Sequence, residues 1–125
     1  MKFIGNIEKE TKRNENFRKV LNTTERSQLV VMSLLPGEEI GMEIHPDTDQ
    51  FIRIEEGEAM VILDGEETEI EDDFAVVIPA GVEHNVVNTG DESLKLYTIY
   101  TPAHHPAETI HKTKAEAEAS EESHH

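Results

Sequence analysis

The chain has 125 residues, the size of a single domain, and carries 11 Lys and Arg against 27 Asp and Glu, a formal charge of −16. The absence of cysteine excludes a disulfide framework, a thiolate nucleophile and a cysteine-ligated zinc site. No apolar stretch approaches the length of a membrane span, and the N-terminal apolar run is short. We therefore expect no signal peptide, no membrane partner and a cytoplasmic protein.

The charge is distributed unevenly along the chain. Residues 1–26 carry a net charge of +3, residues 27–111 carry −17 and residues 112–125 carry −2. Proteins bind nucleic acids largely by neutralising phosphates with Lys and Arg, and the acidic central part would repel them. We expect no nucleic-acid partner.

The first segment, residues 1–26, is predicted to be an arm of strand and loop. Residues 8–18 are polar without a clear period, which favours a loop or a short turn. The apolar residues Phe3–Ile7 could form a strand that exchanges with a second copy, because the basic arm complements the acidic body. We therefore expect a homodimer.

The body, residues 27–103, shows short apolar runs separated by turn residues. Asp64-Gly65 tolerates the positive φ angles of a tight hairpin turn. Many short strands with turns between them predict an all-β antiparallel sandwich or barrel. The predicted strands span residues 29–34, 50–54, 59–63, 66–70, 74–78, 83–88 and 94–100.

The last segment, residues 104–125, is predicted to be an acidic tail. Its lysines precede its glutamates, the order that the helix dipole disfavours, so we expect a solvated helix or disorder that contributes little to stability. His104 and His105 are adjacent, and neighbouring side chains of an extended chain point in different directions, which favours a surface loop over a second metal site. His124 and His125 are either native or the remnant of a tag.

Two histidines of the body, His45 and His84, lie beside turn residues. Glu43 and His45 are two positions apart, so on a strand their side chains point to the same face. If that face is the interior of a barrel, both side chains reach one space. A single interior histidine is more often a packed residue than a metal ligand.

Two segments resemble the signatures of the cupin superfamily. The first, G-E-E-I-G-M-E-I-H-P-D-T-D-Q-F-I-R-I-E-E-G over residues 37–57, places Glu43 and His45 at the two histidine positions of the family and Gln50 at its glutamate position. The second, D-F-A-V-V-I-P-A-G-V-E-H-N-V-V-N over residues 73–88, retains His84 and has Asp73 where the family has glycine. The resemblance implies a double-stranded β-helix, or jelly-roll, barrel with one divalent metal ion in its mouth.

The ligand set departs from the three histidines and one glutamate of the family. Glu43, His45 and His84 still supply one carboxylate and two imidazoles, with Gln50 as a neutral fourth ligand or a hydrogen-bonding neighbour. Nitrogen and oxygen ligands of this kind suit iron, manganese, nickel or cobalt, and zinc is a further candidate. The alternative is a cupin that has lost its metal and retains a polar pocket.

The resemblance also implies a small-molecule ligand or substrate. Small cupins include dioxygenases and sugar isomerases or epimerases, and the alternative is a non-catalytic module that binds a metal or a small ligand. A phosphomannose-isomerase-like role is disfavoured, because Arg53 and Lys95 are the only basic residues of the body available for a phosphate. Arg53 is also out of phase with Gln50 on its strand.

Overall fold

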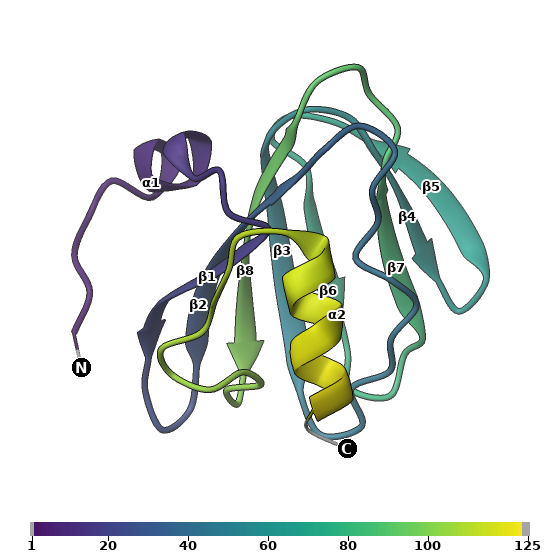
Figure 1. The fold of residues 1–125 in the computed structure, drawn as a ribbon. Helices are drawn as coiled ribbons and strands as arrows, with labels where there is room; N and C mark the ends of the chain where they lie inside the picture. Colours follow the sequence, from purple (N-terminus) through teal and green to yellow (C-terminus); the bar gives the residue numbers. More distant parts are fainter. Residues whose placement is uncertain (1, 124–125) are drawn as a thin grey trace.

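The computed structural model describes residues 2–123, with the backbone alone for residues 121–123, so His124 and His125 lie outside the described residues. Antiparallel strands form two sheets, one in the order β6-β3-β8-β2-β1-β9 and one in the order β5-β4-β7 (Figure 1). The strands are β1 (Arg18–Thr23), β2 (Gln28–Leu34), β3 (Asp49–Glu56), β4 (Ala59–Leu63), β5 (Glu66–Ile70), β6 (Ala75–Ile78), β7 (His84–Asn88), β8 (Leu94–Thr101) and β9 (Ile110–His111).

The core lies between the two sheets and follows the period of two in the sequence. Along β8 the side chains alternate, and Leu94, Leu96, Thr98 and Tyr100 are buried. Leu94, Leu96 and Tyr100 form one apolar cluster with inward-facing side chains of both sheets. The predicted all-β double-sheet architecture is therefore confirmed.

The tight turns also follow the sequence. Asp64 and Gly65 both have positive φ, 47° and 84°, as the predicted hairpin turn between β4 and β5 requires. Asp73 has a φ of 72°, a left-handed conformation that explains why the family has glycine there. Aspartate is among the residues that adopt this conformation most readily.

Strand pairing brings several chain segments to one end of the barrel. In the pairing of β3 with β8, Asp49 lies opposite Thr101, so the start of β3 and the end of β8 are neighbours. The backbone N–H of Gly81 donates to the carbonyl of His45 at 2.9 Å, which holds the turn before β7 against the segment before β3. The segments around residues 45, 81 and 102 therefore meet at this end.

The N-terminal arm begins with a helix, α1 (Ile7–Arg13), so the predicted strand over Phe3–Ile7 is wrong, and the loop or short turn predicted over residues 8–18 is confined to residues 14–17. The Asn6 side chain accepts a hydrogen bond from the Lys9 N–H at 3.0 Å, and acidic residues in the first turn and basic residues in the last suit the helix dipole. The helix contacts β2, β3 and β8. Exchange of an N-terminal strand loses its basis, while the homodimer stays a prediction.

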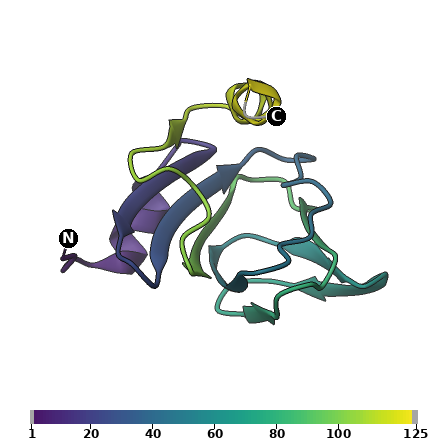
Figure 2. The same ribbon diagram turned by 90° about the horizontal axis from the view of Figure 1, so that it is seen from below.

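The C-terminal segment forms a helix, one of the two states expected for it, but this helix packs on the body and is not a fully solvated tail. β9 pairs with β1, and α2 (Lys114–Ser123) follows it (Figure 2). The hydroxyl of Thr113 accepts from the Glu116 N–H at 3.2 Å, and the Glu116 carboxylate accepts from the Lys112 N–H at 2.5 Å, a reciprocal cap that outweighs the unfavourable charge order. Ala117 is 3 % exposed and belongs to the core. Neither described helix is long and apolar enough to cross a membrane.

Candidate metal centre

Backbone pairing sets Glu43 beside His84. The segment between β2 and β3 runs along β7, and the N–H groups of Glu43 and His84 each donate to the other residue's carbonyl at 2.9 Å. Gly41, with a φ of 110°, bends the chain just before Glu43, and its N–H donates to the Asn85 side chain at 2.9 Å. The fold therefore fixes Glu43 next to β7 although no regular strand includes it.

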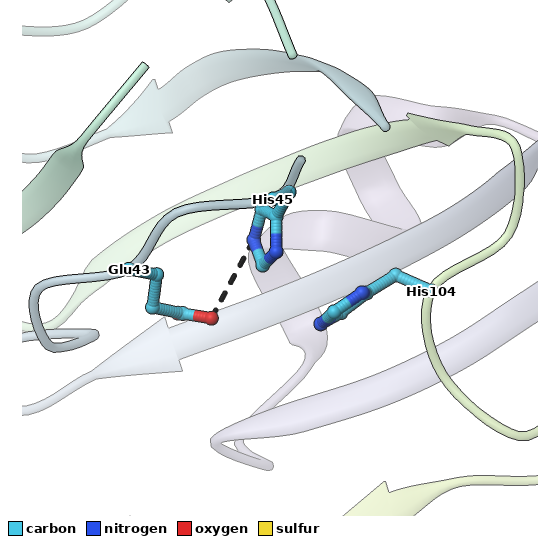
Figure 3. A group of neighbouring side chains, drawn as sticks. All are labelled: Glu43, His45 and His104. Carbon is cyan, nitrogen blue, oxygen red and sulfur yellow. Dashed lines mark ion pairs between the residues drawn. The ribbon is translucent and has the colours of Figure 1, made fainter. Parts of the chain in front are cut away.

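The Glu43 and His45 side chains face each other, as their spacing predicts. Oε2 of Glu43 lies 3.5 Å from Nε2 of His45 (Figure 3). The His45 side chain is 6 % exposed and that of Glu43 is 24 % exposed. Burial, with added repulsion from His104, His84 and Arg18, lowers the pKa of His45 to about 4. At neutral pH its imidazole is therefore uncharged and has a lone pair for a ligand.

The His84 ring also lies next to the His45 ring. Their ring centroids are 5.0 Å apart, and His84 is 3 % exposed. Nδ1 of His84 is 2.9 Å from the carbonyl of Val82, a contact in which the protonated nitrogen donates. This hydrogen bond selects the tautomer that leaves the lone pair on Nε2, the arrangement found in metal-binding histidines.

Gln50, the third buried residue of the set, carries an unsatisfied oxygen. It is 3 % exposed, and its Nε2 donates to the Thr98 hydroxyl at 3.0 Å. Its Oε1 is buried, and no described residue donates to it. A buried amide oxygen without a partner is costly, whereas a cation or a donor on a bound ligand would satisfy it. The donor set therefore fits a divalent metal ion.

A residue that the sequence interpretation placed in a surface loop completes the tightest cluster. Ligand atoms of Glu43, His45 and His104 all lie within 4.8 Å of one another. The ring centroids of His45 and His104 are 4.1 Å apart, and His104 extends toward the other two side chains from the loop after β8 (Figure 3). His84 and Gln50 are outside this closest group. The predicted surface loop is confirmed, because His104 is exposed in the loop after β8, but the sequence did not show that this loop brings His104 to Glu43 and His45.

The fold, rather than local sequence, places His104 there. Because Asp49 at the start of β3 pairs with Thr101 at the end of β8, the loop that leaves β8 passes the segment that holds His45. The sequence signal for this proximity is weak: a proline lies in each segment, Pro46 shortly before β3 and Pro102 directly after β8. Without the strand order this signal does not connect them.

The cluster combines one carboxylate with imidazoles and is open on one side. His45 and His84 are buried, while His104 is exposed. Such a set can hold a divalent cation and leave a coordination position that a small molecule reaches from solvent. A double-sheet barrel with a histidine–carboxylate cluster at one end is the architecture of the cupins.

Comparisons with known proteins agree. The Cupin_2 family, described as a cupin domain, matches residues 30–100. The uncharacterized protein YrkC of Bacillus subtilis is 48 % identical over 96 % of this chain and 68 % of its own, and the uncharacterized protein L612 of Acanthamoeba polyphaga mimivirus is 45 % identical over 83 % and 68 %. The crystal structure of BH2720 from Bacillus halodurans is similar with a TM-score of 0.92 and 50 % identity, over 94 % of this chain and 93 % of that one. The chain belongs to the cupin family.

Proposed function

We propose that this cupin holds one divalent metal ion at the end of its barrel through Glu43, His45 and His104. The observation that carries the proposal is the convergence of their ligand atoms within 4.8 Å. His84, whose ring centroid is 5.0 Å from that of His45, and the unsatisfied buried oxygen of Gln50 would serve as further ligands or hydrogen-bonding partners. Glu43 would be the single anionic ligand, so it supplies most of the electrostatic attraction.

The bound metal would supply a Lewis-acid centre for a small organic molecule. The chain's own residues prepare the site: the burial of His45 keeps its imidazole neutral, and the Val82 carbonyl fixes the tautomer of His84. Exposed His104 borders the side from which the molecule would enter. Dioxygenase-like or isomerase-like chemistry suits such a site.

A phosphorylated sugar is a poor candidate for the substrate. Arg53 makes ion pairs with Glu55 and Asp73, at 3.1 and 3.0 Å, and Lys95 donates to the Asn14 carbonyl and the Ser33 hydroxyl. Both basic side chains are therefore committed to structural contacts. A doubly charged phosphate would find neither of them at the metal centre.

Metal analysis of protein purified without nickel tests the proposal. We expect about one equivalent of a transition metal per chain, its loss in Glu43→Gln, and its retention in Glu66→Gln, a control in the exposed hairpin strand β5. Equal metal content in wild type and Glu43→Gln would refute the site. A panel of small organic substrates, with and without oxygen, then separates an enzyme from a non-catalytic binding module, which would retain metal without turnover.

A further inference from the structure

A buried arginine reaches the same end of the barrel from the N-terminal arm. Arg18 opens β1 and is only 2 % exposed. It borders a small pocket of about 170 Å³ whose walls include His104, His105, Thr109 and His111. Pairing of β1 with β9 places Arg18 opposite His111. The pocket therefore lies between the first strand and the chain that follows β8.

The guanidinium of Arg18 has no anionic partner among the residues whose side chains are described. Its Nη1 lies 3.3 Å from Nδ1 of His111, and its central carbon lies 5.3 Å from the centroid of the Phe17 ring. Its Nε is buried and makes no hydrogen bond within the described structure. A buried charge is costly unless it is paired.

The lack of an anionic partner for Arg18 among the described residues contrasts with the ion pairs that another arginine makes in this acidic chain. The chain has 27 acidic residues, and Arg53 is paired with two of them, Glu55 and Asp73. Arg18 instead faces a pocket walled by imidazoles and polar groups. Among the described side chains, its guanidinium therefore has no anionic counterion.

A second unsatisfied nitrogen belongs to the same pocket. Nε2 of His105 is buried and has no hydrogen-bond partner in the described part of the chain. Arg18 and His105 both line the pocket. A carboxylate in the pocket could accept hydrogen bonds from the Arg18 guanidinium and from the Nε2–H of a neutral His105 ring, since burial lowers the pKa of His105 to about 2. Arg18 brings the one permanent positive charge, which matches a carboxylate better than a phosphate dianion.

The pocket adjoins the candidate metal centre through His104. That residue lines the pocket, and its ring centroid is 4.1 Å from that of His45. We propose that the Arg18–His105 pocket binds the carboxylate of a small organic acid, whose remainder extends past His104 toward Glu43 and His45. The second half of this statement rests on the proposed metal function, whereas carboxylate binding itself does not.

Calorimetric titration of metal-free protein with acetate tests carboxylate binding at constant ionic strength. Acetamide serves as the neutral isostere and inorganic phosphate as the dianion. We expect acetate to bind more tightly than either probe, and Arg18→Met to weaken acetate binding by about tenfold or more, since a charge-assisted pair is lost. Arg53→Met, the control on the outer side of the sheet, should bind acetate like wild type.

Three results would overturn the proposal: equal binding of acetate and acetamide, tighter binding of phosphate, or the same loss in Arg53→Met as in Arg18→Met. If Arg18→Met does not fold, thermal unfolding of the wild type decides, because acetate but not acetamide should raise its Tm. Metal-free protein keeps the two proposals apart. Acetate binding in a chain that takes up no metal would refute the metal function and leave the carboxylate pocket standing.

Discussion

The side-chain oxygen of Gln28 accepts a hydrogen bond from the backbone N–H of His104 at 3.1 Å. The same oxygen accepts from the His105 N–H at 2.9 Å, and the amide nitrogen donates to the His105 carbonyl at 2.6 Å. Gln28 itself is 1 % exposed, at the start of β2. One buried amide thus holds the loop that carries His104 over the end of the barrel.

Gln28 is therefore a positioning residue, and Gln28→Leu should weaken metal binding. The leucine leaves the loop backbone without its partners, so His104 is no longer fixed, and we expect a loss of about 10- to 100-fold in affinity. Metal titration measures it. A double-mutant cycle with His104→Ala supplies the specific check: if Gln28 acts through His104, Gln28→Leu should cost little more once His104 is absent. Additive losses would mean a general disturbance of the fold.

Two substitutions can transfer the single carboxylate of the site from position 43 to position 50. Glu43→Gln removes the one anionic ligand while keeping the shape of the side chain, and we expect metal affinity to fall by more than about 100-fold. Gln50→Glu in the same background restores one negative charge where the cupin family has its glutamate, and should recover much of the affinity. Titration of the single and double variants measures both effects.

Gln50→Ala provides the matched comparison, since it removes a neutral amide oxygen from a buried position. It should weaken metal binding less than Glu43→Gln does, because a neutral ligand contributes less attraction to a cation. A reversed order would identify Gln50 rather than Glu43 as the dominant ligand. No recovery in the Glu43→Gln, Gln50→Glu double variant would show that the amide oxygen of Gln50 does not reach the ion.

The sequence predicted the parts of this site that depend on local spacing. Glu43 and His45 follow the period of a strand, and His84 sits at a fixed distance from the turn before β7, so their proximity follows from the motif. His104 and Arg18 enter the site through the pairing of β8 with β3 and of β1 with β9. Such long-range pairing leaves no periodic signal in the chain.

The two helices gave weak signals in the sequence for a different reason: α1 was not predicted, whereas α2 confirms the helix that was one of two states expected for the C-terminal tail. Both are short, and their apolar residues give no clear helical period, which is the main signal for an amphipathic helix. Their evidence lies in the caps, at Asn6 for α1 and in the Thr113–Glu116 pair for α2. Capping residues are worth about 1 kcal/mol each, comparable with the charge effects that argued against the second helix.

The stability of the metal-free protein should fall in mild acid because of His45. Its pKa is lowered from 6.5 to about 4, mainly by burial. Below pH 6.5, His45 is therefore protonated in the unfolded chain, whereas in the folded protein it is protonated only at about pH 4. The contribution of neutral, buried His45 to the free energy of unfolding is complete above pH 6.5. It is lost as the pH falls toward 4, and the free energy of unfolding decreases by about 1–3 kcal/mol.

Urea unfolding of wild type and His45→Gln over this pH range isolates the effect, because both chains share the other titrating groups. The difference in unfolding free energy, wild type minus variant, should decrease as the pH falls. A constant difference between pH 7 and pH 4 would show that His45 is not protonated differently in the folded and unfolded states.

Packing of α2 on the body predicts a position-specific response to charge. Ala117 is 3 % exposed and contacts the core, whereas Ala119, two residues further along the same helix, is exposed. Ala117→Asp would bury a carboxylate without a partner and should lower the free energy of unfolding by about 1–3 kcal/mol, while Ala119→Asp should change it by less than about 0.5 kcal/mol. The two variants have the same composition and net charge, so general repulsion within this acidic chain cancels between them. Equal thermal midpoints would show that the helix does not pack on the barrel, and the sequence-based prediction of a solvated tail would then hold.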